Sequence, residues 1–186
     1  MKAMARVLLA GTLLLTGCTN SAAGPAAPAA ATTTSQFGGT DLAWLEINIA
    51  MDEEILPLLA LVPSRSGSPE VQALALQVQA FTTAELSSLR ELHNQAGLPA
   101  ENPHKGMPMP GMVTPEKVTE ASALSGKDFD TLVVTAIEEH LDQSQDLAGS
   151  EDKSGVEPQT RALAMQIIRT RTAAMNTLDA ASKGIS

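Results

Sequence analysis

Three methionines stand within six residues of a segment rich in proline and glycine: Met107, Met109 and Met112. A methionine thioether is a soft ligand that favours Cu(I), and it binds without losing a proton. Methionine also fills irregular gaps in apolar cores, because its side chain is flexible. The segment therefore has two interpretations that do not exclude each other. It is a loop that binds a soft metal ion, or an apolar lid that packs on the folded domain.

Cysteine chemistry is confined to Cys18, the one cysteine of the chain. A short basic start and an apolar run over 7–15, too short to span a bilayer, lead to Leu15-Thr16-Gly17-Cys18. That order resembles the bacterial lipobox, whose cysteine receives a diacylglycerol group. The alternative is an ordinary signal peptide with a coincidental cysteine. We expect residues 1–18 to be a lipoprotein signal that leaves the protein anchored by lipid outside the cytoplasm.

Composition excludes several classes of function. The chain has 12 basic and 21 acidic residues, and this acidic balance argues against nucleic acid as a partner. Aromatic residues make up 2% of the chain and tyrosine is absent, so a base-stacking surface is not expected. The sequence contains no nucleophile elbow, Walker loop, dinucleotide fingerprint or His-Glu-x-x-His motif. We therefore do not expect an enzyme.

The domain organisation follows from composition and from an internal repeat. Residues 19–40 are rich in alanine, proline and threonine and predict a flexible tether. Residues 41–186 are enough for one domain. A shift of 89 residues aligns its halves without a gap, placing Asp41 on Asp130 and Ala73-Leu74-Ala75 on Ala162-Leu163-Ala164. Such a repeat predicts two copies of one structural unit.

Each half has the pattern of a helical hairpin. Apolar residues recur at helical spacing over 41–62, where Pro57 is expected to kink or shorten the helix. Ser68-Pro69-Glu70 then has the residue types that begin a helix. The first hairpin is thus predicted over 41–98, with its turn at 63–68.

The second hairpin is predicted over 127–186, with a polar turn at 149–156 and a last helix from Pro158. The connection, 99–126, holds the methionine segment and a short helix from Pro115. The sequence of 41–186 shows no strand pattern. The expected fold is all-α, an antiparallel four-helix bundle in which the first and third long helices lie side by side.

Several motifs, which follow one another along the chain as they do in the family, resemble the bacterial domain-of-unknown-function family 305. They are the Pro69–Ala75 and Arg161–Ala164 blocks, Met109-Pro110-Gly111-Met112, Thr114-Pro115-Glu116, Ser125-Gly126 and Phe129-Asp130. The resemblance spans about residues 41–182. It implies a ferritin-like, duplicated and exported bundle, in a family of which some members are linked to extracytoplasmic copper handling.

The same resemblance implies a metal site. Its signature is a His-His pair on the first helix of each half and an acid on the second helix. Here the pairs fall on Met51-Asp52 and His140-Leu141, and the acids on Glu85 and Ala174. The resemblance thus implies a degenerate site with Asp52, Glu85 and His140 as ligands and Met51 as a soft fourth.

The residues themselves leave alternatives at these positions. Glu85 falls at an apolar-periodic position, where a carboxylate needs a partner or a metal, unless it is a surface acid near the helix end. His140 is either a ligand or a half-buried histidine bonded to a neighbouring acid. A ferritin-type di-iron centre is not expected, because Ile137 rather than glutamate precedes His140 by three residues.

Three functions follow as hypotheses. The first is a lipid-anchored protein that binds copper or another metal through the methionine segment and the remnant site. The second is an envelope scaffold that has lost the metal site and binds a protein partner through its surface. The third, a metal oxidase, has the least support because no catalytic motif is present.

Overall fold

The computed structural model describes residues 36–185, so the predicted signal, Cys18 and most of the tether lie outside the described residues. Its helices are α1 (Gly39–Arg65), α2 (Pro69–Ala96), α3 (Pro115–Ser122), α4 (Gly126–Ser154) and α5 (Pro158–Ile185). This part of the chain contains no strand. The predicted all-α class is confirmed.

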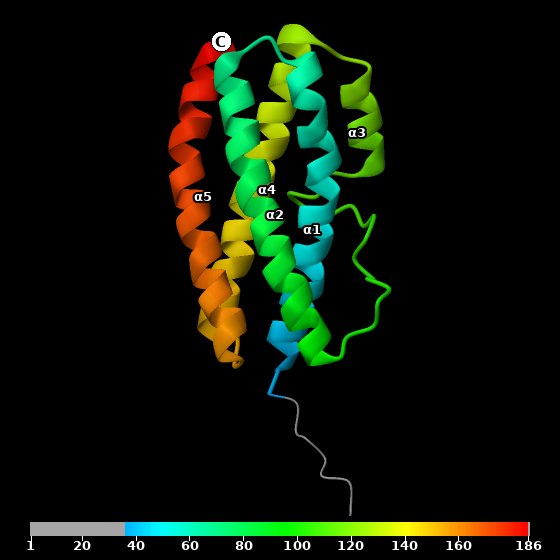
Figure 1. Ribbon diagram of the computed structural model, residues 1–186, viewed down its shortest axis with the longest axis vertical. Helices are drawn as coiled ribbons and strands as arrows, with labels where there is room; N and C mark the ends of the chain where they lie inside the picture. Colours follow the sequence, from blue (N-terminus) through cyan, green and yellow to red (C-terminus); the bar gives the residue numbers. More distant parts are fainter. Residues whose placement is uncertain (1–35, 186) are drawn as a thin grey trace, which may run out of the picture. The chain divides into compact units, whose positions relative to one another are not determined.

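The four long helices form a bundle of two hairpins (Figure 1). In the first hairpin α1 packs on α2, and in the second α4 packs on α5. The hairpins meet where α2 packs on α5 and α1 packs on α4, as the repeat predicted for the first and third long helices. The short helix α3 packs against α1 and α4. Among the described helices, none is long and apolar enough to cross a bilayer.

Local signals at the two ends of α2 act as the sequence indicates. The Ser68 hydroxyl accepts a hydrogen bond from the Val71 backbone N–H at 3.2 Å, and Pro69 occupies the first helical position. At the other end Gly97 adopts a left-handed conformation with φ 70°, which glycine tolerates without strain. These caps fix where the second helix of the hairpin begins and ends.

Two predicted helix ends are wrong. Helix α1 is not shortened at Pro57 and continues past Pro63 to Arg65. Helix α4 runs through Gly149 to Ser154, so the turn predicted over 149–156 is much shorter. A helix-interior proline costs about 3 kcal/mol and a glycine about 1 kcal/mol relative to alanine. The bundle offsets these costs because apolar residues on the same helices near the breakers are buried, namely Leu58, Leu59, Val62 and Ala148.

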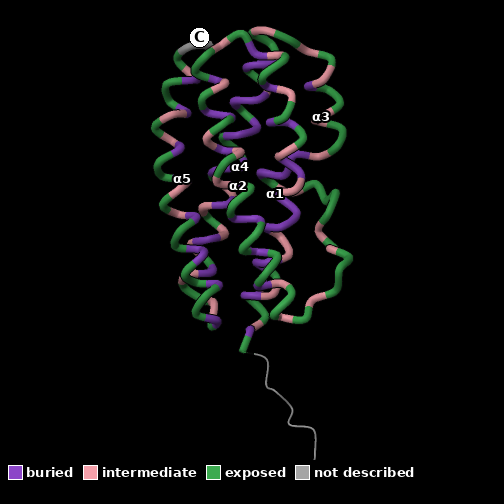
Figure 2. Tube along the Cα trace, viewed as in Figure 1, coloured by how far each residue is buried: buried purple, intermediate pink, exposed green. Residues whose placement is uncertain are grey.

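Buried residues line the inward faces of the long helices and form two large apolar clusters (Figure 2). One cluster lies towards the α1–α2 turn and includes Leu58, Leu74, Phe129, Ile137 and Leu178. The other lies towards the start of α1 and includes Trp44, Leu45, Leu89, Leu163 and Ile167. On each long helix a short polar stretch separates the residues of the two clusters. The bundle thus holds a polar layer between two apolar halves.

Asp41, in the first turn of α1, ties that helix to the α4–α5 turn. Its Oδ1 accepts hydrogen bonds from the backbone N–H groups of Val156 at 3.0 Å and Glu157 at 3.1 Å, and Oδ2 accepts one from Gly38 at 2.6 Å. Burial opposes ionisation, but the neighbouring Glu151 carboxyl group and these N–H donors keep the pKa of Asp41 below its usual value. Burial, and then the adjacent Asp41 carboxylate, raise the pKa of Glu151 to about 8.

The Glu151 carboxyl group makes stability depend on pH in a defined direction. Between pH 4.5, the usual pKa of a glutamate side chain, and about pH 8, the folded state holds this proton more tightly than the unfolded state. We expect the free energy of unfolding to fall as pH rises through this window. Glu151→Gln, which keeps a neutral side chain, should remove that component. The measurement is urea denaturation of both proteins from pH 4.5 to 8.5. A difference between them that is constant with pH would contradict the assignment.

Candidate functional site

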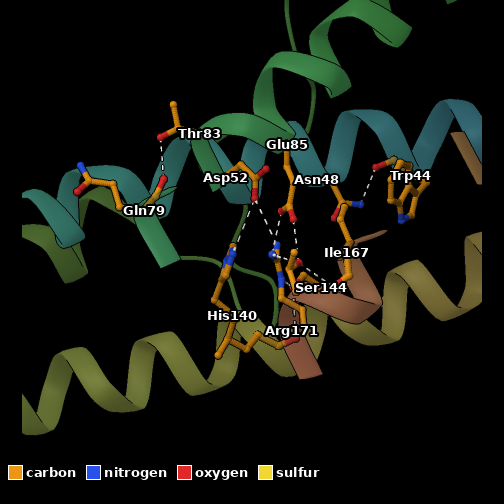
Figure 3. Close-up of polar contacts among 12 residues, drawn as sticks. Trp44, Asn48, Asp52, Gln79, Thr83, Glu85, His140, Ser144, Ile167 and Arg171 are labelled. Atoms are coloured by element: carbon orange, nitrogen blue, oxygen red, sulfur yellow. Dashed lines mark hydrogen bonds and ion pairs between the residues drawn. The ribbon is translucent and has the colours of Figure 1, made fainter. Parts of the chain in front are cut away.

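The predicted residues Asp52, Glu85 and His140 come together in the polar layer, around a side chain that the sequence analysis did not single out (Figure 3). That side chain is Arg171 of α5, which is completely buried. Its Nη1 lies 2.8 Å from Glu85 Oε2 of α2. Its Nη2 lies 3.9 Å from Asp52 Oδ1 of α1. All four long helices meet here, because His140 of α4 places Nε2 3.8 Å from the same Asp52 oxygen.

Neighbouring hydroxyl groups and an aromatic ring complete the surroundings of the guanidinium. Arg171 Nε donates a hydrogen bond to Ser144 Oγ at 2.7 Å. Thr170 Oγ1 donates to the other Glu85 oxygen, Oε1, at 2.9 Å. The guanidinium carbon lies 4.4 Å from the centre of the Phe81 ring, where a cation–π attraction adds to the ion pair. Arg171 is therefore held from three sides in the interior of the bundle.

The internal repeat explains where the polar layer lies and why its two halves contribute different residue types. The 89-residue shift pairs Asp52 with Leu141, Met51 with His140, Glu85 with Ala174, and Thr82 with Arg171. All eight of these side chains are buried. Equivalent positions of the two halves thus face the same centre, but their chemistry differs. A two-fold metal site would need matching ligands in both halves, and the halves do not match.

The electrostatics of the layer follow from burial. Burial, and then the positive charge of Arg171, lower the pKa of His140 to about 3, and a backbone group of Gly111 acts in the opposite direction. Burial raises the pKa of Asp52 well above its usual value despite the attraction of Arg171. Burial also raises the pKa of Glu85, although Arg171 and Thr170 oppose the shift. Arg171 carries the charge that organises the group.

A metal ion does not fit this arrangement. The guanidinium takes up one oxygen of Glu85 at 2.8 Å and approaches the nearer oxygen of Asp52, and its charge repels any further cation. Three atoms that could ligate a metal, Asp52 Oδ2 and both ring nitrogens of His140, have no hydrogen-bond partner, but they belong to only two side chains. Within residues 36–185 no group of three or more His, Cys, Asp or Glu side chains is arranged to hold a metal.

The methionine segment packs on the bundle beside the polar layer. Met112 is buried against Met51 and Ala50 of α1, and Met109 packs on the edge of the same small cluster. Met107, in contrast, is 45% exposed. Gly111 holds the segment against α4, because a Cβ atom there would lie 2.7 Å from the Glu139 carbonyl oxygen and its φ is 72°. The methionine side chains that pack into one cluster are therefore Met51, Met109 and Met112, not Met107.

Arg171 and its partner Ser144 are the functional residues that sequence reasoning missed. A signal for Arg171 was present in the spacing of the last helix. Ile167 precedes it by four residues and Ala174 follows it by three, and both are buried core residues. A basic residue at such a core position demands a buried acid, and Glu85 is that acid.

Removing the guanidinium alone should destabilise the bundle strongly. We expect Arg171→Met to lower the free energy of unfolding by about 3–5 kcal/mol, because it leaves the Glu85 carboxylate buried without a counter-charge. The double variant Arg171→Met/Glu85→Met should recover most of that loss, because two apolar side chains of similar length replace the pair. The measurement is the free energy of unfolding, by chemical denaturation, of the wild type, of Arg171→Met, of Glu85→Met and of the double variant, which together form a double-mutant cycle.

The matched control is an exposed ion pair between α1 and α2. Arg90 Nη2 lies 2.8 Å from Glu53 Oε1, with 56% of the arginine side chain exposed. Arg90→Ala should cost less than about 1 kcal/mol. Equal losses for Arg90→Ala and Arg171→Met, or simple addition of the two losses in the double variant, would contradict the role given to Arg171.

Comparison with known proteins agrees with this architecture. The chain superposes on a DUF305 fragment from Deinococcus radiodurans with a TM-score of 0.70 and 18% identity, covering 77% of this chain and 95% of that one. It superposes on the "putative secreted protein DUF305" from Streptomyces coelicolor with a TM-score of 0.65 and 17% identity, covering 75% and 89%. At these identities the likeness concerns the fold. No curated protein matches the chain.

The family model "Domain of unknown function (DUF305)" matches residues 41–182, which is most of the chain. The match covers both hairpins and the connection between them. This chain therefore belongs to the DUF305 family.

Proposed function

We propose that this protein is a lipoprotein held outside the cytoplasm by lipid on Cys18, and that its bundle is a non-catalytic interaction module for an envelope protein. The Leu15-Thr16-Gly17-Cys18 sequence supports the anchor. The alternative role, a metal centre in the bundle core, is disfavoured by the residues gathered there.

The observation that carries this choice is the Arg171 guanidinium in the polar layer. Its 2.8 Å contact with Glu85 and its approach to Asp52 put a permanent positive charge among the residues expected to ligate a metal. A buried ion pair with added hydrogen bonds is a structural element, because removing one partner leaves the other charge buried without compensation. We infer that the polar layer stabilises the bundle and that a protein partner binds the bundle surface.

The charge of that surface narrows the kind of partner. The chain carries a net charge of −9, and the loss of Lys2 and Arg6 with a signal would leave ten basic and 21 acidic residues, a net charge of −11. Such a surface repels anionic lipid headgroups and attracts proteins with a basic face. The lipid would hold the bundle near the membrane, and charge would select a basic envelope protein.

A second candidate function rests on the cluster of Met51, Met109 and Met112. Three methionine side chains in one partly buried cluster offer thioethers as a soft ligand set for Cu(I). The same cluster is also a reasonable apolar contact, because methionine packs well in irregular gaps. A direct titration distinguishes the two.

The test is a Cu(I) titration of residues 34–186, purified without a histidine tag, in competition with a chromophoric chelator. The interaction-module proposal expects no binding tighter than micromolar and no change in melting temperature. Tight one-to-one binding that disappears on replacing Met51, Met109 and Met112 by leucine would establish the second candidate instead. Leucine conserves the apolar volume, so those variants should still fold.

Two further variants locate any metal in the core. His140→Gln and Glu85→Gln each replace one expected core ligand with a neutral amide. Because Glu85→Gln also breaks the ion pair with Arg171, its folding is checked by denaturation before the titration. Cu(I) binding that weakens in either variant would overturn the assignment of the polar layer as a structural element.

The anchor has its own test. We expect the full chain to fractionate with membranes and to take up a labelled fatty acid, because two or more acyl chains give stable anchoring. Cys18→Ser should abolish labelling and release the protein into the soluble extracytoplasmic fraction. A Cys18→Ser protein that stays with membranes to the same extent would contradict the proposed lipid anchor.

A further inference from the structure

Helices α2 and α5 pack on each other, so their outward sides are neighbours on the surface of the bundle. The short helix α3 packs on α1 and α4 instead. Figure 1 shows the connection and α3 alongside α1, with α5 at the opposite edge of the bundle. Within the part of the chain that the structure describes, the middle of the α2 and α5 surface is therefore left open to a partner.

The internal repeat gives α2 and α5 the same outward positions. Exposed residues recur at helical spacing along α2, namely Ala73, Leu76, Ala80, Thr83, Ala84 and Ser87. A shift of 89 residues places each of them on an exposed residue of α5, from Ala162 to Asn176. These two matching rows of six residues are named the α2–α5 face. Because the rows are related by the repeat, the face matches itself position by position.

One matched pair in the α2–α5 face consists of two large apolar residues. Leu76 is 61% exposed, and its equivalent Met165 is 48% exposed. The other large exposed apolar residues in the described part of the chain are Met107 and Val156, which lie outside the long helices. A single exposed apolar residue is ordinary on a protein surface. Here the same position is apolar and exposed in both halves, which favours a contact surface.

The charge of the α2–α5 face differs from that of the whole chain, which is −9. Between Glu70 and Glu91 the one acid of α2 is Glu85, which is buried. Helix α5 has no acid before Asp179, and the one charge on the face is the cation Arg169. Exposed acids gather elsewhere, and α4 alone carries Asp128, Glu138, Glu139, Asp142 and Asp146.

The α2–α5 face is large enough for a specific contact between two proteins. Its stretch of α2 without an exposed charge, from Val71 to Leu89, has 19 residues. That stretch is about 28 Å long, and two helices side by side are about 20 Å wide. The footprint is then about 550 Å² per copy, or about 1,100 Å² for two copies, against the roughly 1,000 Å² that specific interfaces exceed.

We propose that two copies of this chain associate through their α2–α5 faces as a two-fold symmetric dimer. Such a contact brings the same patch of both copies together, and the repeat supplies matching positions on the two helices. Arg169 of each copy approaches a protein of net negative charge, whereas the acidic side of the bundle would repel a second copy.

Other occupants of the α2–α5 face fit its charge less well. A protein with a basic face finds no exposed acid there, and it meets the cation Arg169. A bilayer surface favours helices with several basic residues and exposed aromatic or leucine anchors, and the face has one arginine and one leucine. The basic envelope protein proposed above would bind the acidic side, so the two contacts are independent.

Sedimentation equilibrium of residues 34–186, which form one compact unit, measures the dissociation constant of the dimer. We expect dimers between micromolar and submillimolar concentration. Raising the ionic strength from about 0.05 M to about 0.5 M should strengthen the dimer, because salt screens the repulsion between two acidic copies. A complex with a basic partner would weaken under the same change.

Two substitutions test the face directly. Leu76→Glu and Met165→Glu change exposed side chains, so the core of the bundle stays intact. Each enters a symmetric dimer twice, and each should weaken the dimer at least about tenfold because an unpaired charge is buried. Met107→Glu is the matched control. It adds the same charge at a 45% exposed methionine outside the face and should leave the dissociation constant unchanged.

Amide NMR spectra recorded on dilution locate the contact. The signals of Thr83 and Thr172, in the middle of the face, should shift as the dimer dissociates. The signal of Glu138, on the exposed side of α4, should not move. The melting temperature of each variant in dilute solution checks that the monomer still folds.

Several results would overturn the proposal. A bundle that stays monomeric at submillimolar concentration would contradict it outright. A dimer that Leu76→Glu and Met165→Glu leave intact, or that Met107→Glu weakens equally, would not use this face. Monomers that bind vesicles of zwitterionic lipid through Leu76 and Met165 would assign the face to a membrane instead.

Discussion

The ion pair between Arg171 and Glu85 is the constraint on which the rest of the bundle depends. A guanidinium cannot be left in an apolar core without acceptors, and burying one costs several kcal/mol before its partners are counted. Here Glu85, Ser144 and the Phe81 ring supply those partners, and Asp52 lies just beyond hydrogen-bond distance. Because the partners come from α1, α2 and α4, the four long helices must keep one register. A sliding of any helix by one turn would leave the charge unmatched.

This constraint also links the fold to function. The internal repeat brings equivalent positions to one centre, which is the natural place for a shared metal site. In this chain that centre holds a cation supplied by the protein itself. Glu85 and Asp52 thus keep a positive partner, while His140 is kept neutral by burial and by the same guanidinium. The repeat supplies the geometry, and the different side chains of the two halves decide what that geometry holds.

Periodic sequence signals predicted the architecture well. The 89-residue repeat and the Ser68-Pro69 helix start gave the hairpins and their arrangement, because apolar spacing and capping act locally. The continuation of α1 past Pro57 and Pro63, and of α4 past Gly149, could not be read locally, since tertiary packing offsets the cost of a helix breaker. Asp52, Glu85 and His140 were identified by resemblance. Their charge states, however, depend on Arg171, which is 86 residues from Glu85 in the sequence. Contacts of that separation are set only when the helices pack.

The Arg171 guanidinium supplies the positive charge of the polar layer and leaves no place there for a metal ion. A Co²⁺ titration of the wild-type bundle and of Arg171→Ala tests this directly. Four-coordinate Co²⁺ absorbs visible light strongly enough to report occupancy. We expect no such band for the wild-type protein, and a band for Arg171→Ala that is lost again with His140→Gln. A band in the wild-type protein that disappears on His140→Gln would contradict this role of Arg171, because the site would then hold a metal with Arg171 in place.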